Sequence, residues 1–241
     1  MRFLKMRIWT CLLTAAVLLA VTLSLAGFGT AMASGTNGYT YVWQNPVGYG
    51  EQVFSTNALS NNAVWSVGAY GCIEYWNGTT VTKQASGTTN HLYGVSAYDA
   101  THVWAVGEAR TILFYNGTSW AKQTAPTLPY SYDLLAVSAA DTTHIWAVGG
   151  HDGFNNAVIL FSNGTTWTVQ QTMATGGFTD IYAYNASNVW AVSGWTWRYN
   201  GATWSQVNDG SVRMPYQVSA YSTTNLWAVD WDGTILNSTN I

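Results

Sequence analysis

Five short, almost entirely apolar runs with a tryptophan in second position recur along this chain. They are Val64-Trp65-Ser66-Val67-Gly68, Val103-Trp104-Ala105-Val106-Gly107, Ile145-Trp146-Ala147-Val148-Gly149, Val189-Trp190-Ala191-Val192-Ser193 and Leu226-Trp227-Ala228-Val229-Asp230. Their tryptophans are 39, 42, 44 and 37 residues apart, a period typical of one blade of a β-propeller. Because a strand with one wet face alternates apolar and polar residues, these runs predict strands that are covered on both faces.

The second repeat shows the whole unit most clearly. A β-rich run at Tyr93–Ala97 is followed by the apolar run Val103–Val106, by Thr111–Tyr115 and by a last run at Ser119–Gln123, with turn residues between them. Short β runs at this spacing, separated by turn residues, indicate antiparallel strands. The unit therefore predicts a blade of four strands, with the tryptophans in its core.

The fifth repeat ends before its fourth strand, and the chain start offers a replacement. Thr234-Ile235-Leu236 matches Thr111-Ile112-Leu113, and the chain ends at Ile241. Trp43 precedes Trp65 by 22 residues, close to the 23 residues that separate Trp167 from Trp190. We therefore predict an all-β fold, a five-bladed β-propeller of four-stranded antiparallel blades in which Tyr39–Gln44 completes the last blade and closes the ring.

Asn-Gly pairs recur between the third and fourth strands of the repeat, at residues 77–78, 116–117, 163–164 and 200–201. Asn-Gly between two β runs predicts a tight hairpin, because both residues tolerate positive φ. Three of these asparagines also form glycosylation sequons. The turn interpretation is preferred, since it also accounts for Asn200, which has no sequon.

The turns also carry a resemblance to a known family. The pattern Gly-x-Thr/Ser-Trp, as in Gly117-Thr118-Ser119-Trp120, resembles the end of the Asp-box, the bacterial neuraminidase-type repeat of sialidase-like propellers. The whole unit resembles the repeat of secreted bacterial propeller proteins and covers essentially all of residues 34–241. The box aspartate is absent, since Trp76, Tyr115, Ser162 and Tyr199 stand in its place. The resemblance therefore implies the fold more than an activity.

The first 33 residues have the organisation of a signal peptide. Three basic residues precede the uncharged run Ile8–Ala26, and Ala31-Met32-Ala33 forms a small-x-small cleavage site. We expect a signal peptide at 1–33, a propeller at 34–241 and a secreted, extracellular product. The alternative is an uncleaved anchor that holds the protein at the cell surface, because the run of 19 residues is long enough to span a bilayer.

Charge and cysteine content limit the partners. Residues 34–241 contain five basic residues against eleven acidic ones, a formal charge of −6, and such a surface repels nucleic acid. Cys72 is the one cysteine beyond the predicted signal peptide, so an intramolecular disulfide is excluded and a buried thiol is expected. We expect a monomer held together by its core.

One side of the predicted disc is uniform and the other is variable. The turns after the first and third strands are nearly alike in all repeats, whereas the remaining loops differ in length and chemistry. Variable loops on a repetitive scaffold are where binding usually resides. The candidate ligand-binding residues of these loops are Tyr70, Glu108, Arg110, Tyr130, Tyr132, His151, Asp152, Trp195, Arg198, Arg213, Tyr216, Asp230, Trp231 and Asp232.

Several of these residues also have a purely structural interpretation. Trp195 and Trp231 could pack between blades, and Arg198 could lie against Trp195 and Trp197. His102 and His144, at a uniform turn, are interpreted as hydrogen-bonding groups of that turn. His151-Asp152 and the Asp230–Gly233 loop lack the further carboxylates of a calcium site, so neither a metal nor another cofactor is predicted.

Three functions fit these features. The leading hypothesis is a non-catalytic, lectin-like protein that binds a glycan or cell surface, because aromatic rings and carboxylates match sugar rings and hydroxyls. A scaffold that binds an extracellular protein is the alternative. A sialidase-like glycoside hydrolase is the third, but such hydrolysis needs paired carboxylates and sialidases add an arginine cluster. The arginines Arg110, Arg198 and Arg213 lie in three different repeats.

Export should remove the first 33 residues. Because the cleavage site ends at Ala33, the secreted protein should begin at Ser34, and the intact mass of protein from the culture medium checks this. A product that stays in the membrane fraction with Met1–Ala33 attached would show that the segment is an anchor.

Overall fold

The computed structural model describes residues 32–34, 40–42, 51–151, 155–173, 176–207 and 215–238. The chain divides into two compact units, Met1–Tyr49 and Gly50–Ile241, and each is considered by itself. In the first unit, β1 (Met32–Ser34) pairs antiparallel with β2 (Thr40–Val42). No helix among the described residues is long and apolar enough to cross a membrane.

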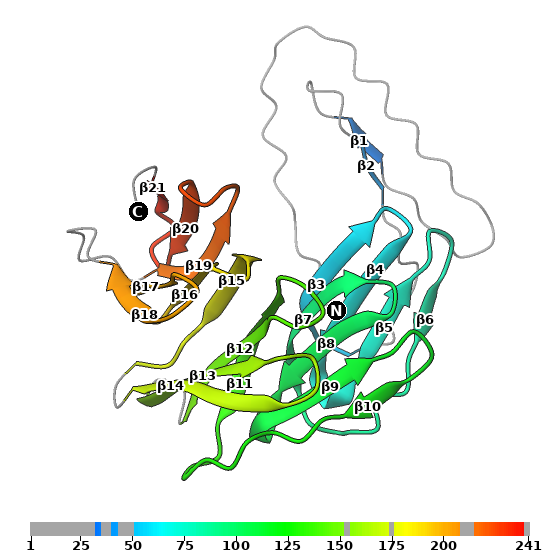
Figure 1. The fold of residues 1–241 in the computed structure, drawn as a ribbon. Helices are drawn as coiled ribbons and strands as arrows, with labels where there is room; N and C mark the ends of the chain where they lie inside the picture. The colour runs from blue at the N-terminus through cyan, green and yellow to red at the C-terminus, as the bar shows by residue number, and fades with distance from the viewer. Residues whose placement is uncertain are drawn as a thin grey trace, which may run out of the picture. The chain divides into compact units, whose positions relative to one another are not determined.

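The second unit is a five-bladed β-propeller of antiparallel sheets (Figure 1). Blade 1 comprises β3 (Val53–Ser60), β4 (Ala63–Gly68), β5 (Ile73–Trp76) and β6 (Val81–Lys83). Blade 2 comprises β7 (Leu92–Asp99), β8 (His102–Gly107), β9 (Thr111–Tyr115) and β10 (Trp120–Lys122). Blade 3 comprises β11 (Asp133–Ala139), β12 (Ile145–His151), β13 (Asn155–Ser162) and β14 (Trp167–Met173). Blade 4 comprises β15 (Asp180–Asn185), β16 (Asn188–Val192), β17 (Thr196–Tyr199) and β18 (Trp204–Val207). Blade 5 comprises β19 (Pro215–Ala220), β20 (Leu226–Asp230) and β21 (Ile235–Ser238).

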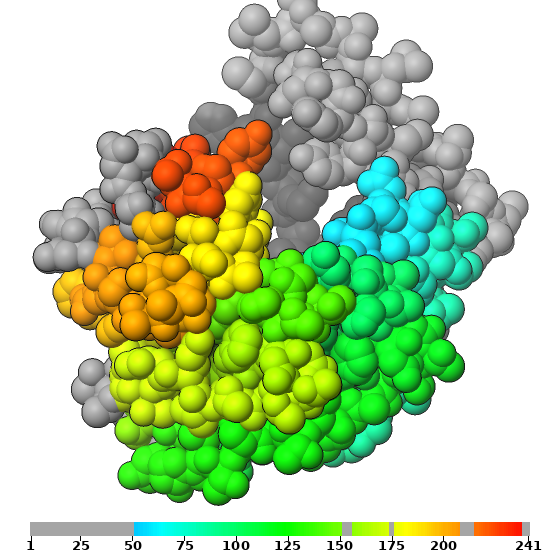
Figure 2. All heavy atoms as spheres, in the orientation of Figure 1, coloured from blue at the N-terminus to red at the C-terminus, as the bar shows by residue number. Residues whose placement is uncertain are grey.

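Successive blades lie side by side in chain order, as the space-filling view shows from cyan to red (Figure 2). The first strands of consecutive blades pack against each other, from β3 to β7, β11, β15 and β19. The predicted strand order within each blade and the five-bladed fold are therefore confirmed.

The second strands of blades 2, 3 and 4 are covered on both faces, as their unbroken apolar sequences predict. The prediction is wrong for blade 5, where Trp227 and Val229 are 47% and 37% exposed. We call the side chains that pack on the following blade the forward face, in blade 2 Trp104, Val106 and Ile112. The rear face packs on the preceding blade and consists there of Val103, Ala105 and Leu113. All six side chains are at most 1% exposed, and burying a large apolar side chain stabilises the fold by about 2–3 kcal/mol.

The final glycine of the apolar run is required by a close approach within the blade. At Gly107 a Cβ atom would lie 1.9 Å from the backbone oxygen of His91, at the start of β7. Backbone atoms cannot move aside as a flexible side chain can, so this position excludes larger residues.

The predicted turns are confirmed in their hydrogen bonds. In the hairpin between β9 and β10, Asn116 Oδ1 accepts bonds from the backbone N–H groups of Thr118 and Ser119, each at 3.0 Å, and Gly117 has φ 91°. In the turn between β7 and β8, Asp99 accepts a bond from the Thr101 N–H at 2.7 Å and lies 2.9 Å from His102 Nδ1. Burial raises the pKa of Asp99, but these bonds outweigh it and hold the pKa at about 2.

The structure differs from the sequence prediction at the fourth strand of blade 5. Blade 5 has three strands among the described residues, and Thr40–Val42 pairs with Met32–Ser34 within the first unit. Five residues separate β1 from β2, so this pairing is local in sequence. Trp43 and Gln44 lie outside the described residues, as does the predicted signal peptide apart from Met32 and Ala33.

Side-chain acceptors join the first strands of consecutive blades. Asn57 Oδ1 accepts a bond from the Ala97 N–H at 3.2 Å, Ser96 Oγ from Ala139 at 3.1 Å, and Ser138 Oγ from Ala183 at 2.9 Å. In blade 4 the equivalent residue is Tyr182, and Asp180 Oδ2 instead accepts the Val218 N–H at 2.9 Å. Each of these bonds fixes one blade to the next.

Asp180 makes the junction of blades 4 and 5 sensitive to pH. Burial raises its pKa to about 6, although the backbone N–H groups of Val218 and Ile181 lower it. A raised pKa means that the folded protein binds this proton more tightly than the unfolded chain, so stability falls as pH rises from about 4 to about 6. The ionised group then destabilises the fold by about 3 kcal/mol.

Replacing this carboxylate by an amide should remove the pH dependence. Asp180→Asn keeps an oxygen acceptor for Val218 but cannot ionise, so at pH 7 it should raise the free energy of unfolding by up to about 3 kcal/mol. Below pH 4 the variant and the parent protein should be equally stable. Thermal melts between pH 4 and 7 measure the difference, which isolates Asp180 from other carboxylates; a constant difference across that range would exclude this account.

Candidate functional site

The variable loops lie at one end of the blades because of the antiparallel order of the strands. The described loops after β4, β8, β16 and β20, and the segments that connect blade 1 to blade 2 and blade 2 to blade 3, lie at the end opposite the Asn-Gly turns. We call this end the loop face. It is the side that sequence variation predicted to carry binding.

Five of the predicted side chains expose aromatic rings on the loop face. The exposed fractions are 71% for Tyr70, 49% for Tyr130, 51% for Trp195, 45% for Tyr216 and 81% for Trp231. Tyr216 and Trp231 contact each other edge to face, with ring centroids 6.1 Å apart. Trp195 and Trp231 are therefore surface residues and do not pack between blades.

Exposed aromatic rings do not by themselves distinguish the loop face. Tyr98, Tyr184 and Tyr221 at the opposite end are 46%, 42% and 84% exposed. They occupy one equivalent position of the repeat, just before the turn that follows the first strand. Any assignment of function to the loop face must therefore depend on more than aromatic content.

Two of the predicted ligand-binding residues have structural roles. Tyr132 is 2% exposed and packs in the core between blades 2 and 3, where burial and the nearby Tyr130 raise its pKa. Arg198 places its guanidinium carbon 5.9 Å from the ring centre of Trp190, and its Nη2 donates to Asn188 Oδ1 at 3.0 Å. Arg198 thus packs against a tryptophan, but this is Trp190 and not the Trp195 and Trp197 that the sequence suggested.

The described carboxylates of the predicted site hold their own loops in shape. Glu108 Oε2 accepts a bond from the His91 N–H at 3.1 Å. Asp230 Oδ1 accepts from the Trp231 N–H at 2.6 Å, and Asp232 Oδ1 from the Thr234 N–H at 2.9 Å. In the described part of the chain, no three His, Cys, Asp or Glu side chains come together as metal ligands. The His151 side chain, Asp152 and Arg213 lie outside the described residues.

Arg110 has a left-handed backbone conformation that its equivalents in blades 1 and 5 adopt as glycine. It lies in the short 3₁₀ turn Glu108–Arg110 with φ 59°, in the left-handed region that favours glycine. The equivalent residues of blades 1 and 5 are Gly71 at φ 73° and Gly233 at φ 85°. A residue with a Cβ atom costs roughly 1–2 kcal/mol in this region, and such strain is characteristic of functional sites.

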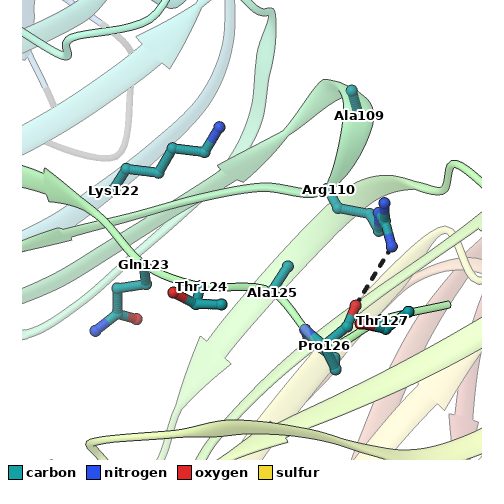
Figure 3. Close-up of a pocket in the computed structure, with 8 residues that line it drawn as sticks. All are labelled: Ala109, Arg110, Lys122, Gln123, Thr124, Ala125, Pro126 and Thr127. Carbon is teal, nitrogen blue, oxygen red and sulfur yellow. Dashed lines mark hydrogen bonds between the residues drawn. The ribbon is translucent and has the colours of Figure 1, made fainter.

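The Arg110 side chain lines a pocket of about 520 Å³ on the loop face (Figure 3). Its Nη1 donates to the backbone oxygen of Pro126 at 3.3 Å, and its backbone N–H donates to the Tyr132 oxygen at 2.7 Å. Lys122, at the end of β10, supplies a second positive charge. Ala109, Gln123, Thr124, Ala125, Pro126 and Thr127 complete the lining.

Within the described part of the chain, neither Arg110 nor Lys122 forms an ion pair; the ion pairs there are Lys83–Glu51, His102–Asp99 and His144–Asp141. Asp133 accepts a bond from the Ala109 N–H at 2.9 Å and thereby supports the loop that carries Arg110. The Arg110 guanidinium has further N–H donors that can bond a carboxylate or another small anion.

Sequence analysis identified Arg110 but not the rest of this pocket. Lys122 and residues 123–127 come from the end of one strand and the segment after it, and no motif marks them. Lys122 is one of only five basic residues beyond the predicted signal peptide. That scarcity is the feature that could have directed attention to it.

Similarity to known proteins is confined to the fold. No family model and no curated protein sequence matches the chain. Several solved structures are similar to the chain. The structure of YCF48 bound to D1 peptide has 18% sequence identity and a TM-score of 0.59, and the match covers 78% of this chain and 63% of the YCF48 chain. YCF48 from Cyanidioschyzon merolae has 16% identity and a TM-score of 0.63, over 87% of this chain and 74% of that one. A streptogramin B lyase has 12% identity and a TM-score of 0.63, over 88% and 76%. The chain thus spans less than two thirds of the peptide-bound YCF48, and these likenesses establish a propeller fold alone.

Substitution of Arg110 should separate backbone strain from side-chain function. Arg110→Ala removes the guanidinium but keeps a Cβ atom in the left-handed region, whereas Arg110→Gly removes both. The glycine variant should be more stable than the alanine variant by about 1 kcal/mol, which denaturant unfolding measures. Equal stability of the two variants would show that position 110 is not strained.

Proposed function

We propose that this protein is a non-catalytic protein-binding scaffold whose loop face holds an acidic segment of a partner polypeptide. The observation that carries the proposal is Arg110, an arginine in a backbone conformation that two other blades reserve for glycine. Because that conformation costs stability, a benefit from its guanidinium is the simplest reason for its presence.

The chemistry of the pocket favours a carboxylate. The arginine guanidinium matches a carboxylate with two parallel hydrogen bonds, and Lys122 adds a point charge within the same pocket. Residues 34–241 carry a formal charge of −6, so an extended polyanion is repelled while one or two carboxylates can still reach the local positive charge. This selectivity suits a short acidic peptide segment.

The surroundings of the pocket fit a peptide better than an isolated ion. Tyr130 lies three residues beyond Thr127 in the same loop and is 49% exposed. Tyrosine is favoured at protein interfaces because it buries a large ring while its hydroxyl remains hydrogen-bonded. The peptide-bound YCF48 supports the proposal as a propeller of similar fold that binds a peptide.

Secretion and glycan binding stay predictions from the sequence. Export of residues 34–241 would place the partner outside the cytoplasm. A glycan ligand would use exposed aromatic rings and carboxylates, and the carboxylates Glu108, Asp230 and Asp232 of the predicted site each already accept a backbone N–H bond. The protein-binding alternative is therefore the function that we propose.

Charge-selective peptide binding tests the proposal. Residues 34–241 would be screened on an array of acidic peptides and of matched peptides with Asn and Gln in place of Asp and Glu, beside a glycan array. Acidic peptides should bind selectively, and binding should weaken with added salt. Arg110→Gly and Lys122→Ala should each reduce affinity about tenfold or more, since a hydrogen bond to a charged group contributes about 1.5–3 kcal/mol.

Lys83→Ala provides a matched control. Lys83 ends the fourth strand of blade 1, as Lys122 ends that of blade 2, but its Nζ forms an ion pair with Glu51 at 2.7 Å. The Lys83→Ala variant removes the same charge as Lys122→Ala from an equivalent position outside the pocket, so its affinity for the peptide should remain unchanged. Equal binding of acidic and amide peptides, or binding to glycans alone, would overturn the proposal.

A further inference from the structure

The turns that follow the second strands of blades 1 and 2 have the same conformation. Each is a 3₁₀ turn, Ala69–Gly71 in blade 1 and Glu108–Arg110 in blade 2. The middle residue of each turn has a left-handed backbone, with φ 55° for Tyr70 and φ 53° for Ala109. Because a Cβ atom disfavours this region, the contacts of each tip are needed to maintain it.

Both tips bond to a side chain at the start of the next blade, but the acceptors differ. The Ala109 N–H donates to Asp133 Oδ1 at 2.9 Å, and the Tyr70 N–H donates to His91 Nδ1 at 3.1 Å. His91 and Asp133 are equivalent, since each directly precedes the leucine that pairs with the last glycine of an apolar run. An imidazole and a carboxylate therefore have the same role at two successive junctions.

The bond from Tyr70 determines which nitrogen of His91 is protonated. A backbone N–H can only donate, so Nδ1 is the unprotonated nitrogen and the proton of the neutral ring lies on Nε2. When the ring gains a second proton, Nδ1 becomes a donor and can no longer accept from Tyr70. Histidine ordinarily changes charge between pH 5 and 8, whereas a carboxyl group accepts hydrogen bonds whether or not it is protonated.

The groups that face His91 come from three neighbouring elements. The His91 ring centroid lies 6.0 Å from that of Phe54 in β3, 5.0 Å from Tyr70 in the blade 1 turn and 6.2 Å from Tyr93 in β7. Glu108 of the blade 2 turn adds a carboxylate, whose Oε2 accepts the His91 N–H at 3.1 Å. His91 is half-buried, so water can deliver a proton to it.

Two further charged side chains belong to the adjoining elements. Arg110 ends the same turn as Glu108, but its guanidinium donates to the Pro126 oxygen at 3.3 Å, in the segment that leads to blade 3. Burial raises the pKa of Tyr93, and the charges of Asp133 and Glu108 raise it further. The surroundings of His91 thus contain carboxylates, and a positively charged ring is electrostatically compatible with them.

The base of the blade 1 turn does not depend on His91. The Ala69 N–H donates to the Gln52 oxygen at 2.8 Å, and the Cys72 N–H donates to the Ala69 oxygen at 3.0 Å. Loss of the Tyr70 bond therefore affects the tip of the turn, while the strands on either side of it remain paired.

We infer that protonation of His91 releases the tip of the blade 1 turn from blade 2 and so gives the loop face a second, acidic form. In the neutral form the Tyr70 ring lies against His91. In the acidic form Nδ1–H and the Tyr70 N–H would face each other as two donors, so the tip moves away and uncovers His91. The blade 2 turn, held by Asp133, keeps its position. The switch is independent of the proposed acidic-peptide pocket, which is lined by blade 2 and the segment after it.

Nuclear magnetic resonance of the ¹⁵N-labelled protein tests the switch, because the two turns provide an internal comparison. From pH 8 to pH 5 the Tyr70 amide signal should shift in step with the ring signals of His91. Its protection from hydrogen exchange, corrected for the intrinsic rate, should fall about tenfold, as loss of one hydrogen bond predicts. Ala109 should keep its protection, which separates the switch from the titration of Asp180 between blades 4 and 5.

Two substitutions at position 91 separate the acceptor from the ring. His91→Asp introduces the acceptor that blade 2 uses, so the Tyr70 amide should be protected at pH 5 as well as at pH 8. His91→Ala removes the acceptor, so the same amide should be unprotected at both values. A loss of protection in acid that persists in His91→Asp would contradict the inference.

The parent protein alone can also overturn the inference. It fails if Tyr70 keeps its protection while the His91 ring becomes charged, or if the His91 signals do not titrate between pH 8 and pH 5. An equal loss of protection at Ala109 would show a change of the whole propeller instead of one turn, and would overturn it as well.

Discussion

The contact between a tryptophan and the small residues of the next blade is the interaction on which this fold depends. Trp104 and Val106 fill the space over Ile145 and Ala147, and alanine leaves room there for the indole ring. Because the second strands of blades 2, 3 and 4 take part in two such contacts, one on each face, their sequences contain no polar alternation. The apolar run and the stacking of blades are therefore two aspects of one constraint.

The junctions between consecutive blades are stabilised in two ways. One is packing, and the other is the bond from a side chain of one first strand to the backbone of the next, as between Ser138 and Ala183. Stability is then approximately a sum over junctions. The junction of blades 4 and 5 is distinct again, since Asp180 replaces the neutral acceptor and adds a desolvated charge.

The sequence predicts those features of this protein that residues determine locally. Asn-Gly turns follow from backbone conformation, and covered strands follow from apolar runs, so blade boundaries agree with the structure. Whether a particular ring is buried depends on residues far away in the chain, which is why Tyr132 was assigned to the surface although it packs beside Leu134. The fourth strand of blade 5 was predicted from spacing alone, and spacing does not include competition from a local hairpin.

The pocket could not be predicted for a related reason. Its lining combines one loop residue, Arg110, with the segment that follows β10, and only the folded blade brings them together. What the repeats do reveal is a departure from their own rule: glycine stands at the left-handed position in blades 1 and 5, whereas blade 2 has arginine. Since glycine adopts this conformation at no steric cost, the backbone of the turn does not require an arginine. The departure places a cation at the loop face, where the variation between repeats is greatest, and so joins a left-handed backbone position of blade 2 to its most distinctive chemistry.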